Sequence, residues 1–557
     1  MRKLILACAA AALAASACIK VDNSLGSSLV DKGLLYDTYT VEFPLTDIMM
    51  KRSSDLSGYS STRVVVGAIR DDIFGLSTRE SAFTLVPATD TLDLGTNPKA
   101  ESFSIYFAAD SVSCADDSQA RILQNFYVSK LSAALDPTKT ASNTEIAHSE
   151  ELITDGLPVY NGSGPLRFSF TKAFAQEYLD AIYSMAPDGI MVNREWDDDQ
   201  IEARYKEYTS KLPGIHIRTN EPSGNGGRIN LFGLSCLEVG SDNNFYVNNN
   251  LAVLYFKNDE VAGRDTTLAI VFVPGEMSLL DENTSMNSGT RFYQFAFNRT
   301  THSFPEGAPG ANLYVEGGSG VKPVISAKEL YNKSKAAIEE KGGNIQDAIV
   351  TKATIVLPFE MPADYRDMKY FPKILSPTIR RTVKDDDGNE TVQFAGLTDA
   401  SVSTENQGDI DRSNLVYSPD ISYHVQEILK RDDLDTADDA DIWFLTIFTE
   451  QIAQAQDSEQ NAYLQQMMYA AYYNSLYGGY GYGGYGGYGG YGSYGYGNSY
   501  SNYYTYAMLA QMMAAANQTQ YTTNTELDKD RYYRGILCGP DATRKPFFRI
   551  TFSVSKK

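Results

Sequence analysis

Short runs of alternating apolar and polar residues, each closed by turn-forming residues, set the main limit on how this chain of 557 residues can fold. Thr38–Phe43 alternates with a period of two, which puts successive side chains on opposite faces of a β-strand. Similar β-branched or aromatic runs recur between Gly, Pro, Asp and Ser residues. Because helices do not alternate with these runs, the pattern favours antiparallel sandwiches over a parallel sheet. The further early runs are Arg63–Ile69, Ser102–Phe107, Ile122–Val128 and Leu166–Phe170.

Helical patterns interrupt the strands at three places. Lys172–Met185 carries apolar residues at helical spacing, Asp199–Leu212 has an acidic start, and Ser326–Glu329 is a capping box. The fold expected from these patterns is mainly β, with two antiparallel β-sandwich-like domains, a few helices and an insertion near the C-terminus. The expected domains are residues 37–220 and 221–450, with residues 527–557 as closing strands of the second.

Residues 451–526 are expected to form that insertion. Its flanks, 451–476 and 506–516, are rich in Ala, Gln, Met and Tyr and predict two helices. Its tip, 477–497, holds twelve Gly, eight Tyr and one Ser, and so many glycines carry too large an entropy cost for a regular fold. The tip is either a tolerated loop insertion or an adhesive element, since tyrosines on a flexible backbone suit weak contacts with sugars, membranes or other chains.

The start of the chain has the pattern of a secretory signal: a positive start, an apolar run from Leu4 and small residues up to Ala17. Cys18 follows directly and resembles the lipobox cysteine of bacterial lipoproteins, whose thiol receives diacylglycerol and whose new amino terminus is usually acylated. Ala15 stands where a lipobox prefers Leu, and an ordinary secretory signal is the alternative. The expected segments are a signal peptide at 1–17 and a lipidated tether at 18–36.

Composition excludes some classes of partner. The formal charge of −22 argues against nucleic acid, whose binding depends on Lys and Arg neutralising phosphates. A hydrophobic content of 43% is enough for folded cores. Cys114, Cys236 and Cys538 are far apart and odd in number, so they form no disulfide framework; one disulfide or free buried thiols are the alternatives.

Three segments carry a family resemblance. Val66–Gly75 ends in a Phe-Gly pair, Asp93–Ser102 has Glu101 at its next-to-last position, and Leu313–Val321 has a tyrosine, a glycine pair and then Gly-Val. They resemble blocks of an uncharacterised family of Bacteroidota outer-membrane lipoproteins, known mainly as a domain of unknown function, although that family usually has Asp where Glu101 stands. The resemblance covers most of residues 20–450 and the closing strand, and it implies a β-sandwich anchored at the outer membrane.

No motif predicts a catalytic residue, a metal site or a cofactor. The four histidines, His148, His216, His302 and His424, are not at ligand spacing, and no Gly-x-Ser-x-Gly elbow occurs. Trp196–Asp199 places an aromatic ring beside carboxylates, as some sugar sites do, but acids at a helix start explain it equally well. A glycosidase would need two carboxyl groups at a set separation.

Four short motifs resemble the sites at which Bacteroidota attach O-glycans. Each has an Asp, then Ser or Thr, then a residue with a methyl group. The expected acceptors are Thr91, Ser111, Thr266 and Thr436.

Together these patterns predict a non-enzymatic lipoprotein, anchored in the outer membrane through Cys18 and facing the cell surface. Lys20 and Asp22 form a weak version of the charged tag that directs such lipoproteins outward. The expected role is a binding or accessory subunit whose partner is an outer-membrane barrel complex or a glycan. The alternatives are a glycan-acting hydrolase and an adhesive surface protein that uses the Gly-Tyr insertion.

Overall fold

The computed structural model describes residues 36–555 except residues 194, 240–244, 248, 278–291, 385–387, 389, 403–406, 435, 436, 438 and 454–520. Within this part, the chain is mainly β, as the sequence predicted: antiparallel, sandwich-like sheets with a few helices. The signal, Cys18, the tether up to residue 35, the Gly-Tyr tip and Thr436 lie outside the described residues.

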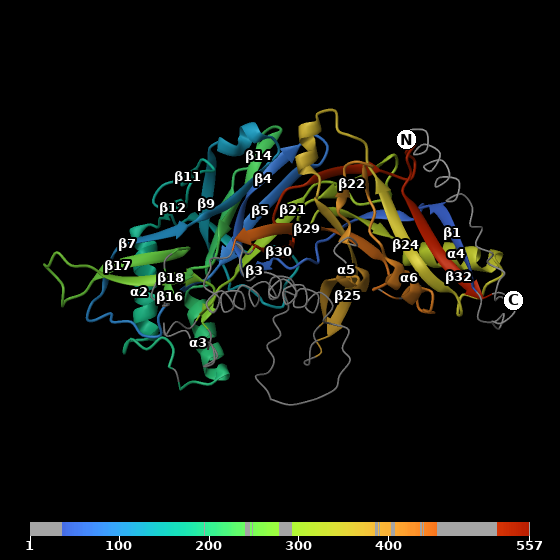
Figure 1. Ribbon diagram of the computed structural model, residues 1–557. Helices are drawn as coiled ribbons and strands as arrows, with labels where there is room; N and C mark the ends of the chain where they lie inside the picture. Colours follow the sequence, from blue (N-terminus) through green and yellow to red (C-terminus); the bar gives the residue numbers. More distant parts are fainter. Residues whose placement is uncertain are drawn as a thin grey trace, which may run out of the picture.

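A ten-stranded and a five-stranded sheet, with two helices, form the N-terminal lobe, at the left of Figure 1. The main path of the larger sheet is β10 (His148–Leu152), β9 (Gln124–Leu131), β13 (Ile215–Thr219), β5 (Gly75–Phe83), β4 (Arg63–Asp71), β14 (Gly226–Gly233) and β8 (Ala109–Cys114). Off this path, β11 (Val159–Tyr160) pairs with β9, and β21 (Ala296–His302) pairs with β5 and with β3 (Tyr59–Ser60). The smaller sheet has the order β12 (Leu166–Ser169), β7 (Lys99–Phe107), β17 (Leu251–Lys257), β18 (Leu268–Pro274) and β6 (Leu85–Pro87).

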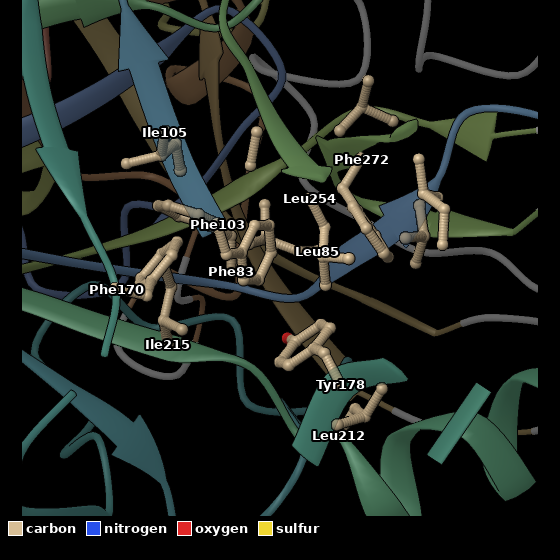
Figure 2. Close-up of a cluster of buried hydrophobic side chains, with 14 of the residues drawn as sticks. Phe83, Leu85, Phe103, Ile105, Phe170, Tyr178, Leu212, Ile215, Leu254 and Phe272 are labelled. Carbon is tan, nitrogen blue, oxygen red and sulfur yellow. The ribbon is translucent and has the colours of Figure 1, made fainter. Parts of the chain in front are cut away.

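The inner faces of these two sheets enclose an aromatic core (Figure 2). Phe103 lies at its centre, with ring centroids 4.7 Å from Phe170, 5.3 Å from Tyr178 and 5.4 Å from Phe272. Tyr178 belongs to α2 (Lys172–Met185), which has the bounds predicted from its apolar spacing. The second helix, α3 (Asp198–Lys211), begins with a capping box between Asp197 and Gln200. Burial of each large side chain stabilises this lobe by roughly 1.5–3 kcal/mol.

Two further sheets, a strand pair and the remaining helices form the C-terminal lobe, at the right of Figure 1. One sheet has the order β1 (Tyr36–Pro44), β32 (Phe547–Ser555), β24 (Ile349–Pro358), β28 (Val416–Tyr417) and β27 (Ile410–Asp411). The other has β2 (Ile48–Arg52), β23 (Val321–Ile325), β29 (Ile442–Ala453), β25 (Ile374–Lys384) and β26 (Glu390–Gly396), with β30 (Tyr521–Leu527) on β29. The helices are α4 (Ala327–Glu340), α5 (Thr398–Val402) and α6 (Ser422–Ile428), and β22 (Asn312–Glu316) pairs with β31 (Arg534–Cys538).

Shorter elements complete the described fold. Two short 3-10 helices, η2 (Asp117–Arg121) and η3 (Tyr365–Tyr370), lie in loops of the N-terminal and C-terminal lobes. Two small hairpins pair β15 (Leu237–Val239) with β16 (Phe245–Val247) and β19 (Glu276–Met277) with β20 (Phe292–Tyr293). No helix among the described residues is long and apolar enough to cross a membrane.

Strand pairing does not follow the boundary expected at residue 220. β14 and β21, from the second predicted domain, pair with β4 and β5 of the first, and β1 pairs with β32 along its full length. Long-range antiparallel pairing, which local patterns do not report, therefore places the N-terminal strand in the C-terminal lobe.

The predicted insertion also begins later than its composition indicates. Residues 451–453 belong to β29 and residues 521–526 to β30, with Gln451 opposite Thr523. Pairing with a neighbouring strand overrides the helix propensity of 451–453, and the Thr-rich stretch after Tyr521 suits a strand. The rest of the insertion, 454–520, lies outside the described residues.

Candidate functional site

The structure places three of the four predicted O-glycan acceptors. Thr91 is exposed and forms a single bridge with Ile190, and Thr266 is exposed between β17 and β18. Ser111 lies on β8 with its hydroxyl buried and without a hydrogen bond in the described residues. A sugar on Ser111 would therefore require the edge of the sheet to open, whereas Thr91 and Thr266 are accessible in the folded chain.

Two of the four histidines come together, which their spacing in the sequence does not indicate. The ring centroids of His148 and His216 lie 4.0 Å apart, because β10 and β13 flank β9. His216 Nε2 lies 3.2 Å from a carboxylate oxygen of Glu80, yet burial lowers the pKa of His216. The described residues contain no group of three or more His, Cys, Asp or Glu side chains placed to hold a metal ion. Cys114, Cys236 and Cys538 are free thiols.

Large apolar side chains are exposed on neighbouring loops along one edge of the molecule. Leu123, which follows η2, is 72% exposed, and Tyr365, at the start of η3, is 75% exposed. Figure 1 shows η2 (blue) and η3 (gold) beside each other at the upper edge, above β4 and β14. We call this edge the rim. Its exposed apolar residues are Ile73 in the β4–β5 turn, Leu123 after η2, Val159 on β11 beside the start of β9, and Met361 and Tyr365 before and at the start of η3.

Local hydrogen bonds fix the loops of the rim. In the turn between β4 and β5, the Asp71 carboxylate accepts the backbone N–H groups of Ile73 and Phe74. Gly75, with a φ of +72°, closes this turn in a conformation that other residues rarely adopt. The side chains of Asp116 and Asp364 cap η2 and η3 in the same way.

Ion pairs then join these loops across the two lobes. Arg534, on β31, donates to Asp71 at 2.9 Å and to Asp367 of η3 at 3.2 Å. Lys369 of η3 pairs with Asp117 of η2. Burial raises the pKa of Asp71, but the backbone hydrogen bonds and the Arg534 guanidinium together lower it below its usual value, so the carboxylate stays charged at neutral pH. The rim is therefore held in one arrangement before any partner arrives. Sequence reasoning missed it because its loops are far apart in the chain: Ile73 and Asp364 are separated by 291 positions.

A second region contains a carboxylic acid with an altered proton affinity. Glu276, at the start of β19, lies near Glu202 of α3, and burial together with this charge raises the pKa of Glu276 to about 7. A carboxyl group that keeps its proton near neutral pH can act as a general acid. The acids of the neighbouring Trp196–Asp199 segment have a structural role: Asp197 caps α3, and Asp198 and Asp199 lie in its first turn.

Comparisons with known proteins add no relative: no family model, curated protein or solved structure matches this chain.

Proposed function

We propose that this protein is a non-enzymatic lipoprotein of the outer membrane, anchored through Cys18, that binds a partner at the cell surface. The rim is the observation that supports this function. Exposed apolar side chains gathered on one edge are typical of interaction sites, and Tyr, Met and Arg are enriched in protein interfaces. Because its loops are already braced, the rim would lose little conformational entropy on binding.

A protein partner suits the rim better than a glycan. The rim alternates aliphatic side chains such as Leu123 and Met361 with ionic groups such as Arg366 and Lys369, whereas sugar sites depend on planar rings and polar groups. We therefore favour a neighbouring outer-membrane barrel complex, the class of partner that a lipid-anchored accessory subunit meets. The segment from Cys18 to Tyr36 spans at most about 60 Å, enough for the rim to reach such a neighbour.

Site-specific crosslinking in intact cells tests this function. A photo-crosslinking amino acid at position 365 is expected to capture a barrel protein, and the double variant Leu123→Ser/Met361→Ser is expected to weaken that capture. Tyr255, which is exposed on β17 in the N-terminal lobe, provides the matched control position. Capture at 365 that equals capture at 255, or recovery of monomer or glycan alone, would contradict the assignment. A Cys18→Ala variant tests the anchor separately, because it should lose the lipid-modified N-terminal peptide in mass spectrometry.

The acidic pair supports a second candidate, a glycan-acting hydrolase. Glu276 has the raised pKa of a general acid, and Glu202 supplies a nearby carboxylate. Under this alternative, the wild-type protein releases reducing sugar from surface polysaccharides, and Glu276→Gln abolishes release while leaving the fold intact. Glu207→Gln is the control, because Glu207 is an exposed acid on α3, the helix that carries Glu202. A wild-type protein that is inactive on such a panel would exclude this candidate.

A further inference from the structure

A buried cluster of charged residues lies where the two lobes meet. It comes from β4 and β5 of the N-terminal lobe, from β22 and β23, and from the end of β30 and the segment that joins it to β31. We call it the junction cluster. Its cations are Arg63, Arg79, Lys322, Lys529 and Arg531, and its carboxylates are Glu316, Glu526, Asp528 and Asp530.

The carboxylates of this cluster bind groups other than Arg79. Glu526 accepts from Arg63 at 2.6 Å and from Arg531 at 3.2 Å. Asp528 accepts from the Tyr533 hydroxyl at 2.6 Å, and Asp530 lies 3.7 Å from Arg63.

The Glu316 carboxylate likewise has partners other than Arg79. It is 3.1 Å from His302 Nδ1 and accepts the backbone N–H of Val321 at 3.0 Å. No hydrogen bond or ion pair found among the described residues joins Arg79 to any carboxylate of the junction cluster.

Arg79 is 1% exposed, and only one end of its guanidinium has partners. Nη1 donates to Ser77 Oγ and to the Thr78 carbonyl, both at 2.9 Å, and lies 3.4 Å from His302 Nε2. Nε and Nη2 have no hydrogen-bond partner in the described part of the chain. These two N–H groups form the side-on fork with which arginine holds oxyanions and other anions. Leaving two buried donors of a cation unpaired is strongly unfavourable.

Only a residue without a side chain can stand beside this fork. Gly318, with a φ of +58°, faces the guanidinium, and a Cβ atom there would lie 2.5 Å from Nη2. Lys322 is also fully buried, and it donates to the carbonyls of Glu316 at 2.6 Å and Gly318 at 2.9 Å rather than to a carboxylate. Burial lowers the pKa of Arg79 to about 10 and that of Lys322 to about 7, because nearby carboxylates only partly offset the burial of these charges.

We infer that the junction binds a small inorganic anion of the size and charge of chloride on Nε and Nη2 of Arg79, beside Gly318. The anion supplies the negative charge and the acceptor that the fork lacks. It binds a strand of the N-terminal lobe next to the Gly317–Gly320 turn of the C-terminal lobe and so strengthens the contact between them. An anion that binds the folded chain alone raises its stability in a saturable way.

Halide replacement in the full-length protein tests this site. At constant ionic strength, replacing gluconate with chloride is expected to raise the denaturation midpoint to a plateau. Arg79→Met should abolish this dependence, whereas Arg70→Met, which changes a half-exposed arginine on β4, should keep it. Because Arg79→Met can fail to fold, crystals of the wild-type protein grown in bromide provide an independent measurement. An anomalous peak at the fork supports the site. A chloride-independent midpoint, or an ordered water with no anomalous signal at the fork, would overturn it.

Discussion

Acidification is expected to destabilise the C-terminal lobe through one histidine. His424 lies on α6, where its Nε2 donates to the Ala440 carbonyl at 3.2 Å. Burial, with a smaller contribution from Arg431, lowers the pKa of His424 from 6.5 to about 4. The unfolded chain therefore binds one more proton than the folded chain at pH values between about 4 and 6.5. The contribution of a neutral His424 to stability is fully present above pH 6.5 and is lost as the pH falls toward 4.

The size of this effect follows from the two pKa values. Between pH 7 and pH 5, protonation of His424 in the unfolded chain lowers the free energy of unfolding by about 2 kcal/mol. Glutamine can donate to the same carbonyl and does not titrate, so His424→Gln should lose about 2 kcal/mol less than the wild type over this range. The other buried histidines are unchanged in both proteins and cancel in the comparison.

Urea denaturation at pH 7 and pH 5 measures this difference, with the transition of the C-terminal lobe followed by tryptophan fluorescence. A Trp196→Phe background, in which the N-terminal lobe has no tryptophan, leaves Trp443 on β29 to report on that lobe. Tyr423→Ser changes an exposed neighbour on α6 and should keep the wild-type pH dependence. Equal losses of stability in His424→Gln and the wild type between the two pH values would show that His424 does not cause the acid sensitivity.

Three further predictions concern the core, the rim and the insertion. Phe103→Ala removes the ring at the centre of the aromatic core and should cost about 3–5 kcal/mol in urea denaturation, whereas the exposed Tyr255→Ala should cost little. Arg534→Ala leaves the nearly buried Asp71 without its cation; it should cost about 1–3 kcal/mol and weaken crosslinking at the rim, and Arg534→Lys should restore part of both. Deletion of 477–497 should leave the denaturation midpoint unchanged, because the β29–β30 pairing ends at Ala453 opposite Tyr521; loss of surface binding in that variant with an unchanged midpoint would instead support the adhesive role.

Local patterns predicted local structure well. The helix expected at Lys172–Met185 has those bounds, and the Ser326 side chain caps α4 by accepting the Glu329 N–H. Both depend on spacings of three or four residues, which the sequence displays directly. The mainly β class followed from strand periodicity in the same way.

Features that depend on distant pairing were not predicted. The period of Thr38–Phe43 indicates a strand, but it does not indicate that Tyr39 lies opposite Phe552. The close pair of His148 and His216 and the bridge from Arg534 to Asp71 also arise only when remote strands meet. Taken alone, each of these residues is of a type that is common at ordinary surface or core positions. The charged and titratable groups that the structure brings together therefore lie at contacts between remote strands, which the sequence does not reveal.

The rim and the junction cluster are mechanically linked through one short segment. Residues 526–531 enter the junction, and Arg534, three residues later, braces the β4–β5 turn and η3. The turn and η2 belong to the N-terminal lobe, whereas Phe371, which directly follows η3, packs in the core of the C-terminal lobe. A partner that contacts the loops of both lobes in the rim therefore binds only when the lobes keep their relative position. That position depends on the junction cluster. If the anion at Arg79 strengthens the junction, its removal should weaken rim crosslinking without changing any residue of the rim.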